Sequence, residues 1–510
     1  MAIATRYETV IGLEVHSQLL TRTKMFCGCD AAYVGDAPNT HVCPVCLGLP
    51  GSLPVINRQA VEFTVMTGLA LHCSINEHSK FDRKNYPYPD LMKGYQISQY
   101  DAPFCTNGWL EIDLEGEVKR IGVNRVHLEE DTAKLFHRVS PWGDQYALVD
   151  VNRSGVPLME IVSEPDLRSP AEARAYGLKL RQILRYLGVS EADMEKGNMR
   201  FDTNVSIRPV GSSELGAKVE VKNINSFRSV IRALEYEVQR QGALLDEGGR
   251  IPQETRGWVE DRGVTVSQRS KESAHDYRYF PEPDLPPMHL EPTWVSEVRA
   301  RLPELPEARR RRFAADYGLP PYDADLLTST RAQADFFEAC LSTSAGGDLR
   351  DRAKAVANWL LGDLAHLLHE AGLDVEQSPV TPSQLNALQD LVEASTINLN
   401  TAREVFAQVF STGQDPKRIV EERGLLQISD RDQLAGTVAR IIEGAPQAVT
   451  DYRAGKAQAF TYLVGQVMKE TRGRANPALV NVLLKEHAKG GPRLARFVPV
   501  QTTRRHAVAP

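Results

Sequence analysis

The sequence predicts an α+β protein, in which a domain with a largely antiparallel sheet is followed by an all-α region. Up to about residue 290, short β-branched runs are separated by Gly, Pro and Asn, as expected for strands joined by turns. From about Thr293 onward, apolar residues recur at helical spacing instead. The proline-rich strip PEPDLPPMHLEP lies between the two patterns and indicates a linker or a turn-rich surface segment.

Two helices are predicted within the sheet domain. The first covers Pro170–Leu187, because Ser169 is a favourable N-cap and proline is well tolerated at the first helical position. The second covers residues 226–241, where apolar side chains keep a helical period. In the all-α region the same period predicts helices at 308–317, 332–342, 348–371, 382–394, 401–412, 430–444, 446–454, 457–471 and 476–488.

These patterns divide the chain into parts. We expect a sheet domain at 1–293 with a cysteine-rich insertion at 27–46, and a helical domain at 294–425. A small all-α tail domain is expected at 426–490. Residues 491–510 are basic and lack a periodic pattern, so we expect them to be disordered.

The composition is that of an ordinary soluble protein, with 42% hydrophobic and 25% charged residues in 510. The N-terminal stretch MAIATRYETV has no apolar core of a signal peptide, and no segment is long enough to cross a bilayer. We therefore expect a cytoplasmic protein with no membrane partner. The net charge of −6 argues against a bulk electrostatic coat for nucleic acid, and so against a general DNA-binding protein, but local basic patches remain compatible with it.

The most informative segment is residues 9–20, TVIGLEVHSQLL, where a glutamate and a histidine interrupt an apolar strand. Side chains alternate along a strand, so Glu14 and His16 share one face, opposite Ile11, Leu13 and Val15. Ionisable groups in an apolar run are costly unless they are paired or bind a metal. The segment therefore indicates a functional site.

Two further segments bring carboxylates into apolar surroundings. VNRVHLEEDTAK contains Glu129 and Glu130, and VPLMEIVSEPD contains Glu160. Together with Glu14 and His16, they would suit Mg²⁺, which prefers oxygen ligands and keeps waters for a nucleotide phosphate. The alternative is a set of solvated surface carboxylates, which fits the acidic run at residues 129–131 well and Glu160 poorly.

Four of the seven cysteines form the pattern C-x-C-x13-C-P-V-C. Two close pairs on tight turns can place four thiolates around one tetrahedral Zn²⁺, and such a site would be structural because no coordination position stays open. A redox pair or a chance cluster is the alternative. The predicted ligands are Cys27, Cys29, Cys43 and Cys46.

Basic and aromatic residues are interleaved in KFDRKNYPYPDLMKGYQISQYD, which includes Lys84, Tyr86 and Tyr88. This chemistry suits phosphate contact and base stacking, although a tyrosine-rich surface hairpin would have the same composition. Lys222, in VEVKNINSFR, offers a further donor.

A basic turn near the C-terminus carries Lys469, Arg472 and Arg474 before a helix that Asn476 can cap. It could contact a phosphate backbone, or simply join two helices of a hairpin.

The chain has neither a G-x-x-x-x-G-K-[ST] loop nor a G-x-G-x-x-G motif, so any ATP must be bound by another fold. It also shows no serine-rich amidase signature.

Taken together, the motifs resemble the B subunit of the tRNA-dependent aspartyl/glutamyl amidotransferases, over about residues 6–489. The matching segments are IGLEVHSQL, KFDRKNYPYPDLMKGYQISQYD, RVHLEEDTAK, DVNRSGVPLMEIVSEPDLRSP, KVEVKNINSFR, ETRGW, DYRYFPEPDLPP and FTYLVGQVMKETRGRANPALVNVLLKEH. The four-cysteine site occurs in only part of this family, and here all four thiols are present.

The resemblance implies a glutamine-synthetase-like cradle, then a helical domain and a tail domain. It implies that ATP phosphorylates the side-chain carboxylate of Glu-tRNA(Gln) or Asp-tRNA(Asn), and that ammonia from a glutaminase partner, the amidase subunit, then forms the amide. A small third subunit would brace this heterotrimer, and an amidase partner explains the missing nucleophile.

The resemblance also implies roles for the residues. It assigns Mg²⁺ and catalysis to Glu14, His16, Glu129, Glu130 and Glu160. It places the nucleotide or the acceptor end near Lys84, Tyr86, Tyr88 and Lys222, and the body of the tRNA near Lys469, Arg472 and Arg474.

Two other functions fit some of these features. A non-catalytic tRNA-binding adaptor would need the basic segments but not the carboxylates in apolar strands. A stand-alone ATP-dependent carboxylate–amine ligase would need the carboxylates but no partner protein.

Overall fold

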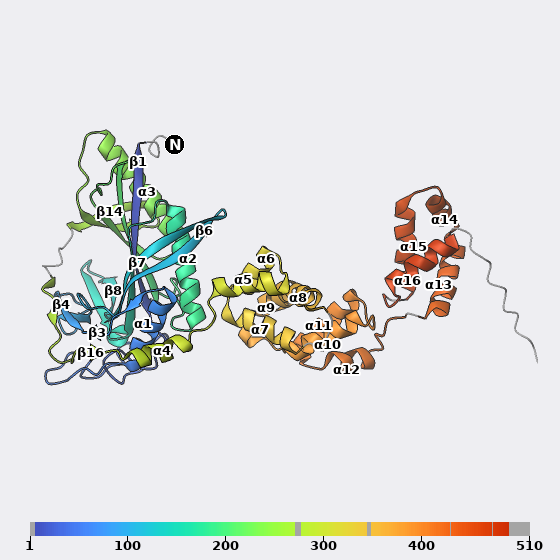
Figure 1. Cartoon of the computed structure of the whole chain (residues 1–510), viewed down its shortest axis with the longest axis horizontal. Coiled ribbons are helices and arrows are strands. Elements are labelled where there is room, and N and C mark those ends of the chain that lie inside the picture. Colours follow the sequence, from blue (N-terminus) through green and yellow to red (C-terminus); the bar gives the residue numbers. More distant parts are fainter. Residues whose placement is uncertain (1–5, 271–276, 344–347, 429, 472, 489–510) are drawn as a thin grey trace, which may run out of the picture. The chain divides into compact units, whose positions relative to one another are not determined.

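The computed structural model describes residues 6–270, 277–343, 348–428, 430–471 and 473–488. The chain forms two compact units, residues 1–309 with 329–331 and residues 310–328 with 332–510 (Figure 1). The predicted division at residues 293 and 425 stays a prediction, and the tail at 491–510 lies outside the described residues. No helix of the described segments has both the length and the apolar character that a membrane span requires.

The first unit is built on a nine-stranded sheet in the order β14-β13-β12-β11-β1-β10-β7-β6-β2. Neighbouring strands are antiparallel except β12 and β13, which are parallel. The prediction of a largely antiparallel sheet is thus confirmed, with one parallel pair that makes the sheet mixed. The strands are β1 (Tyr7–Gln18), β2 (Ser74–Ile75), β6 (Cys105–Leu114), β7 (Glu117–Glu130), β10 (Pro157–Ser163), β11 (Met199–Pro209), β12 (Val219–Ile224), β13 (Glu254–Val259) and β14 (Val264–Ser270).

The predicted alternation along β1 decides which face is buried. Ile11, Leu13 and Val15 are at most 1% exposed and belong to the main hydrophobic core. Three helices pack over this side of the sheet, α1 (Arg58–Ala70), α2 (Pro170–Leu187) and α3 (Phe227–Asp246). Glu14 and His16 therefore point away from the helices.

The two predicted helices of this unit are confirmed, and their ends follow local signals. The Ser169 hydroxyl accepts a hydrogen bond from Glu172 N, and Gly188 ends α2 in the left-handed region. Helix α3 runs five residues beyond the prediction, to Asp246, before Gly248 and Gly249. Helix α1 was missed, because it is mostly buried and shows little contrast between two faces.

Five short strands form two small sheets beside the main one, in the orders β15-β4-β5 and β16-β3. They are β3 (His78–Ser79), β4 (Asp82–Asn85), β5 (Tyr95–Ser98), β15 (Phe280–Pro281) and β16 (Met288–His289). Strand β15 pairs with β4, and this brings the end of the sheet domain beside the segment that holds Lys84. A separate hairpin consists of β8 (Lys134–Val139) and β9 (Gln145–Asp150), followed by a 3₁₀ turn at Val151–Arg153.

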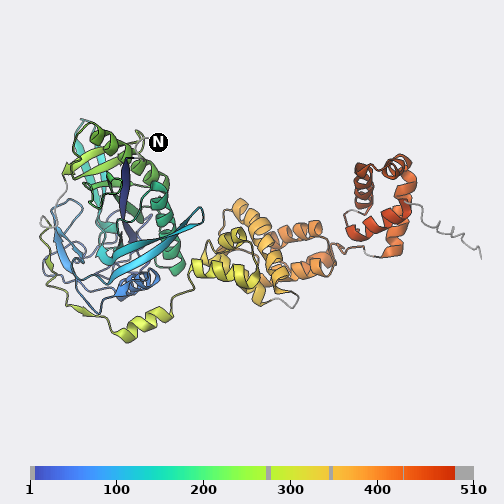
Figure 2. The same cartoon turned by 45° about the horizontal axis from the view of Figure 1, so that its top comes forward.

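The described part of the second unit is helical, drawn in yellow to red in Figure 2. Every helix predicted there is present, although residues 348–371 form two α-helices joined by a π-helical stretch, Trp359–Leu364. Three short helices were missed, α4 (in the first unit), α6 and α12. The helices are α4 (Pro292–Ala300), α5 (Pro306–Tyr317), α6 (Pro321–Leu327), α7 (Arg331–Ser342), α8 (Leu349–Asn358), α9 (Ala365–Ala371), α10 (Pro382–Glu393), α11 (Leu399–Thr412), α12 (Pro416–Glu422), α13 (Arg431–Gly444), α14 (Pro446–Arg453), α15 (Ala457–Glu470) and α16 (Pro477–Ala488).

Candidate active site

A row of ionisable side chains crosses the sheet on the face away from the helices. His16 on β1 lies opposite Glu160 on β10, and Glu160 lies opposite His127 on β7. Residues opposite each other on paired strands project to the same side. Because His127 and Glu129 are two positions apart on one strand, Glu129 joins the same face.

The four side chains are close together. Glu160 Oε2 is 3.3 Å from Nε2 of His16 and 3.3 Å from Nε2 of His127. Glu129 lies 4.0 Å from His16 Nε2 through Oε1, and it accepts a hydrogen bond from Ser98 Oγ at 3.1 Å. One ligand atom each of His16, Glu129 and Glu160 lies within 4.8 Å of the others, so these three could hold a metal ion.

Burial by itself favours the neutral forms of His16 and Glu160. The attraction between their opposite charges favours the ionised forms and is the stronger effect. Burial lowers the pKa of His16, yet the carboxylates of Glu160, Asp202 and Glu129 together outweigh it and raise that pKa to about 9. Burial likewise raises the pKa of Glu160, yet His127 and His16 hold it well below its usual range. The site therefore keeps ionised carboxylates, the form that binds a cation.

Glu14 belongs to a second acidic group. Its carboxylate, with those of Asp202 and Glu220, forms another set whose oxygen atoms lie within 4.8 Å of one another. Glu14 also accepts a hydrogen bond from Asn204 Nδ2 at 2.9 Å. Lys222 Nζ lies 3.1 Å from Asp202 and 3.3 Å from Glu220, so it partly neutralises this group. The predicted pairing of Glu14 with the histidine cluster is therefore not the arrangement seen.

Glu130 lies on the other side of β7 from Glu129. Its carboxylate forms an ion pair with Lys93 and accepts a hydrogen bond from Ile97 N at 3.0 Å. The strand alternation that brings Glu129 into the cluster turns Glu130 to the opposite face, so of the two adjacent glutamates it is Glu129 that lies beside His16 and Glu160.

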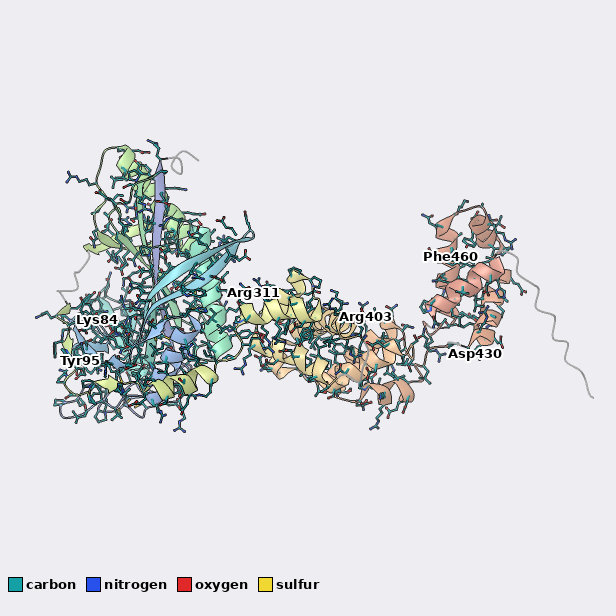
Figure 3. The ribbon with its side chains drawn as sticks, viewed as in Figure 1. Lys84, Tyr95, Arg311, Arg403, Asp430 and Phe460 are labelled. Atoms are coloured by element: carbon teal, nitrogen blue, oxygen red, sulfur yellow. The ribbon has the colours of Figure 1, made fainter. Side chains whose placement is uncertain are left out.

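Both acidic groups line one cavity of about 290 Å³. Lys84 on β4, labelled in Figure 3, lines it too, and its Nζ lies 4.9 Å from the ring centre of Tyr277. Burial lowers the pKa of Lys84, but Tyr279, Glu129, Tyr86 and Glu160 raise it well above its usual value, so the ammonium stays charged. A charged lysine facing a carboxylate cluster is suited to a phosphate that a cation also contacts.

The two tyrosines predicted beside Lys84 are not among the residues that line the cavity. Tyr86 packs edge-on against Tyr277 at 5.6 Å and donates a hydrogen bond to Gln96 Oε1 at 3.2 Å. Tyr88 is 54% exposed. Tyr86 thus contacts the cavity only indirectly, by packing against Tyr277, which lines it.

The four predicted cysteines converge. Their Sγ atoms lie within 4.8 Å of one another, and Cys43 N donates a hydrogen bond to Cys46 Sγ at 3.1 Å. The hydrogen bond from Cys27 lowers the pKa of Cys46 to about 5 against the effect of burial, and the Cys43 backbone and the Lys24 ammonium add to this. Since the thiolate is the form that binds metal, the cluster could hold a metal ion.

The basic turn of the tail is partly described. Lys469 is exposed near the end of α15, and Arg474 donates a hydrogen bond to the Gly424 carbonyl at 3.1 Å. Asn476 caps α16 as expected, accepting hydrogen bonds from Ala478 N and Leu479 N. Arg472 lies outside the described residues.

Several cavity residues escaped the sequence reasoning. Strand alternation could have found His127, two positions before Glu129, and Glu220, two before Lys222. Asp202 has no such local partner, since it meets Glu14 only through the pairing of β11 with β1. Tyr277 and Tyr279 lie in the motif DYRYFPEPDLPP. Nothing in that motif predicts that the strand directly after Tyr279, β15, pairs with β4 and so brings both tyrosines to the cavity.

Comparison with known proteins bears on this site. Residues 9–296 match the family described as the GatB/GatE catalytic domain, and residues 335–487 match the GatB domain. The B subunit of the aspartyl/glutamyl-tRNA(Asn/Gln) amidotransferase of Thermomicrobium roseum is 58% identical over 94% of this chain and 98% of its own length. That of Dehalococcoides mccartyi strain ATCC BAA-2266 is 56% identical over 96% of this chain and 100% of its own.

The chain belongs to this B-subunit family. The resemblance inferred from the sequence motifs is thereby confirmed. The catalytic-domain match of the family includes the histidine–carboxylate cluster, the second acidic group, Lys84 and the four cysteines.

Proposed function

We propose that this chain is the subunit that activates the side-chain carboxylate of a glutamate or aspartate attached to tRNA. As a member of the family, it is the B subunit of a tRNA-dependent amidotransferase. The observation that carries the finer proposal is the convergence of His16, Glu129 and Glu160 beside a charged Lys84 in one cavity.

The reaction has two steps. A carboxylate oxygen of Glu-tRNA(Gln) or Asp-tRNA(Asn) attacks the γ-phosphorus of ATP, an O–P bond forms, and the bond to ADP breaks. Ammonia then attacks the acyl carbon and a C–N bond forms. The bond between that carbon and the phosphate oxygen breaks, inorganic phosphate leaves with the electron pair, and nitrogen loses a proton to give the amide. The first step brings the negative carboxylate up to the negative triphosphate, so cationic groups must neutralise the charge that accumulates there.

His16, Glu129 and Glu160 would hold Mg²⁺. Two carboxylates and one imidazole with ligand atoms within 4.8 Å fit a divalent cation, although the imidazole is a softer ligand than Mg²⁺ usually takes. When bound, the metal would neutralise phosphate charge. Lys84 would contact a phosphate oxygen directly, since it is charged and lines the same cavity.

The second acidic group has a different task in this proposal. Lys222 sits among Glu14, Asp202 and Glu220 and lines the cavity with them. We assign these residues to the nucleotide or to the aminoacyl end of the tRNA. Tyr86 would keep Lys84 and Tyr277 in place, and Tyr88, whose ring centre lies 6.4 Å from that of Tyr86, would lie near the nucleotide or the acceptor end.

The remaining parts of the proposal follow from the family. The sheet domain would be a glutamine-synthetase-like cradle of a cytoplasmic heterotrimer, with an amidase subunit supplying ammonia and a small third subunit. The four cysteines would bind structural Zn²⁺. Lys469, Arg472 and Arg474 would contact the body of the tRNA.

The decisive test compares Glu160→Gln with Glu164→Gln in the complex reconstituted with the amidase and the small third subunit. Glu164 lies four residues further on and accepts a hydrogen bond from Asn124 Nδ2 at 2.8 Å, outside the cavity. We expect Glu160→Gln to lower ATP-dependent amidation by about 10³-fold or more, with glutamine or with ammonium as donor. Glu164→Gln should stay near wild type.

Binding of tRNA distinguishes the alternatives. Glu160→Gln should bind the tRNA as the wild type does, because the substitution removes one charge from a buried cluster. Unchanged amidation in Glu160→Gln would refute the catalytic role and favour a tRNA-binding adaptor. Glutamine-dependent amidation by the isolated chain would favour a stand-alone ligase.

A further inference from the structure

The β8–β9 hairpin offers a surface that the proposed reaction has not used. Its register pairs Phe136 with Leu148 and Arg138 with Tyr146. Because opposite residues share a face and alternate residues do too, Lys134, Phe136 and Arg138 lie on one face with Tyr146 and Leu148. We call this set, Lys134, Phe136, Arg138, Tyr146 and Leu148, the aromatic–basic face.

This face combines stacking surface with positive charge. Lys134 Nζ lies 4.9 Å and Arg138 Cζ lies 5.6 Å from the centre of the Phe136 ring. Tyr146 is 48% and Leu148 54% exposed. At the tip of the hairpin, Trp142 is 87% exposed. Exposed apolar side chains that gather in one place beside polar groups are a mark of an interaction site, whereas single exposed ones are not.

We propose that the aromatic–basic face and Trp142 bind the unpaired 3′ end of the tRNA and guide its aminoacyl group to the cavity. Exposed aromatic rings stack on unpaired bases without regard to sequence, and neighbouring cations contact the phosphates. The aliphatic Leu148 can pack beside a stacked base. The proposal rests on the proposed function, which supplies a tRNA whose terminal residue must enter the cavity.

The connection of the hairpin to the site supports this occupant over a protein. Strand β7 ends at Glu130, directly after the cavity residue Glu129, and β8 begins at Lys134. A chain of five residues therefore links Glu129 to Lys134, where the face begins, a span of at most about 17 Å, and the rest of the face extends from there along β8. The nucleotides that precede the reacting end must lie within such a distance of the cavity, and their phosphates match the charge of Lys134 and Arg138.

The base of the hairpin is held in place by the cysteine-rich loop. Asn39 N donates to Asp150 Oδ1 at 3.1 Å, and Asn39 Nδ2 donates to the Val149 carbonyl at 3.3 Å. Val151 N donates to Asn39 Oδ1 at 2.8 Å. These bonds fix the end of β9, so the face keeps a defined direction while its tip stays accessible.

The test uses a matched pair of variants in the reconstituted complex. The double substitution Arg138→Ala/Tyr146→Ala removes one cross-strand pair of the aromatic–basic face. The control, Val139→Ala/Gln145→Ala, removes the next pair, which points to the other face of the same hairpin. A third variant, Trp142→Ala, removes the tip. Each is titrated with an intact tRNA transcript and with the same transcript lacking its unpaired 3′ nucleotides.

We expect the Arg138/Tyr146 variant to bind intact tRNA about tenfold more weakly than the control, with Trp142→Ala affected in the same direction. The shortened transcript should bind all variants equally, because the contact has been removed from the RNA. With intact Glu-tRNA, KM should rise far more than kcat falls.

Three results would overturn the inference. The first is equal affinity of the face and control variants for intact tRNA. The second is an equal loss with both transcripts. The third is failure of the face variant to assemble with the other two subunits while its tRNA binding is normal, which would identify a protein interface. A wild-type complex that binds no tRNA would instead refute the proposed function itself.

Discussion

Glu160 shows how a single residue can hold a costly charge inside a sheet. It lies between two histidines contributed by the strands on either side, each 3.3 Å away. An isolated carboxylate at this depth would take up a proton. Because both neighbours are imidazoles that can be charged, Glu160 stays ionised, and a cation that binds there must compete with protons on the histidines.

His127 is a positioning residue in this arrangement. It is 3% exposed and contacts Glu160 and Glu129, but it does not belong to the set of three that could hold the metal. We predict that His127→Asn raises the Mg²⁺ concentration needed for half-maximal amidation by about 10- to 100-fold, because the carboxylates lose the partner that orients them. The measurement is a Mg²⁺ titration of the initial rate in the reconstituted complex.

Excess Mg²⁺ should restore most of the activity of His127→Asn, and His366→Asn, at an exposed position of the helical unit, should behave as wild type. A loss of kcat that no Mg²⁺ concentration restores would contradict a positioning role.

At the scale of elements, β7 decides which of two adjacent glutamates serves the site. Glu129 and Glu130 differ by one position, and this places one against the histidines and the other against Lys93. A shift of one residue in the pairing of β7 with β10 would exchange them. The register is held because the same alternation buries Val126 and Leu128 completely in the core.

The loop at residues 27–46 is the second element with a clear prediction. We expect the purified wild-type chain to contain about one Zn per chain, and Cys43→Ser to lose most of it, because a hydroxyl is a poor ligand for Zn²⁺. Metal analysis by plasma mass spectrometry measures this directly.

Cys340→Ser is the matched control, since Cys340 is a buried cysteine of the helical unit, far in sequence from the cluster. It should keep its zinc. A folded wild-type protein without bound zinc after purification in metal-containing buffer would contradict the assignment.

At the scale of the whole molecule, the residues that the structure describes form three separate buried hydrophobic clusters. One contains the sheet and its helices, one is formed between Phe313 and Val420, and one between Leu434 and Ala488. Because the cluster of the first unit shares no residue with the other two, we expect a substitution in one unit to affect mainly the unfolding of that unit.

Two glycine-to-alanine substitutions test this expectation. In α1, an added Cβ at Gly68 would lie 2.8 Å from Cβ of the buried Cys105, so Gly68→Ala should lower the free energy of unfolding of the first unit by about 1–3 kcal/mol. In α15, Gly465 has open space around it, so Gly465→Ala should stabilise the second unit by about 0.5–1 kcal/mol.

Scanning calorimetry and denaturant unfolding measure both effects. Each substitution should move a different transition, and in opposite directions. Equal displacement of every transition by either substitution would show that the units unfold as one.

Much of this molecule could be predicted because the signals are local. Caps and prolines set the ends of α2, and apolar periodicity located the helices of the second unit. The spacing of the four cysteines anticipated their convergence. Helix α1 escaped because its apolar residues surround it on most sides.

The sequence by itself determined the α+β class, the order of its parts, the family, and the fact that Glu14, His16 and Glu160 stand in apolar strands. These depend on neighbours along the chain, which periodicity and motifs report. Only the tertiary structure decided that His16 joins Glu160, Glu129 and His127 while Glu14 joins Asp202 and Glu220. The reason is physical: partners across a sheet are set by strand order and register, and these follow from the packing of the whole core rather than from any one strand.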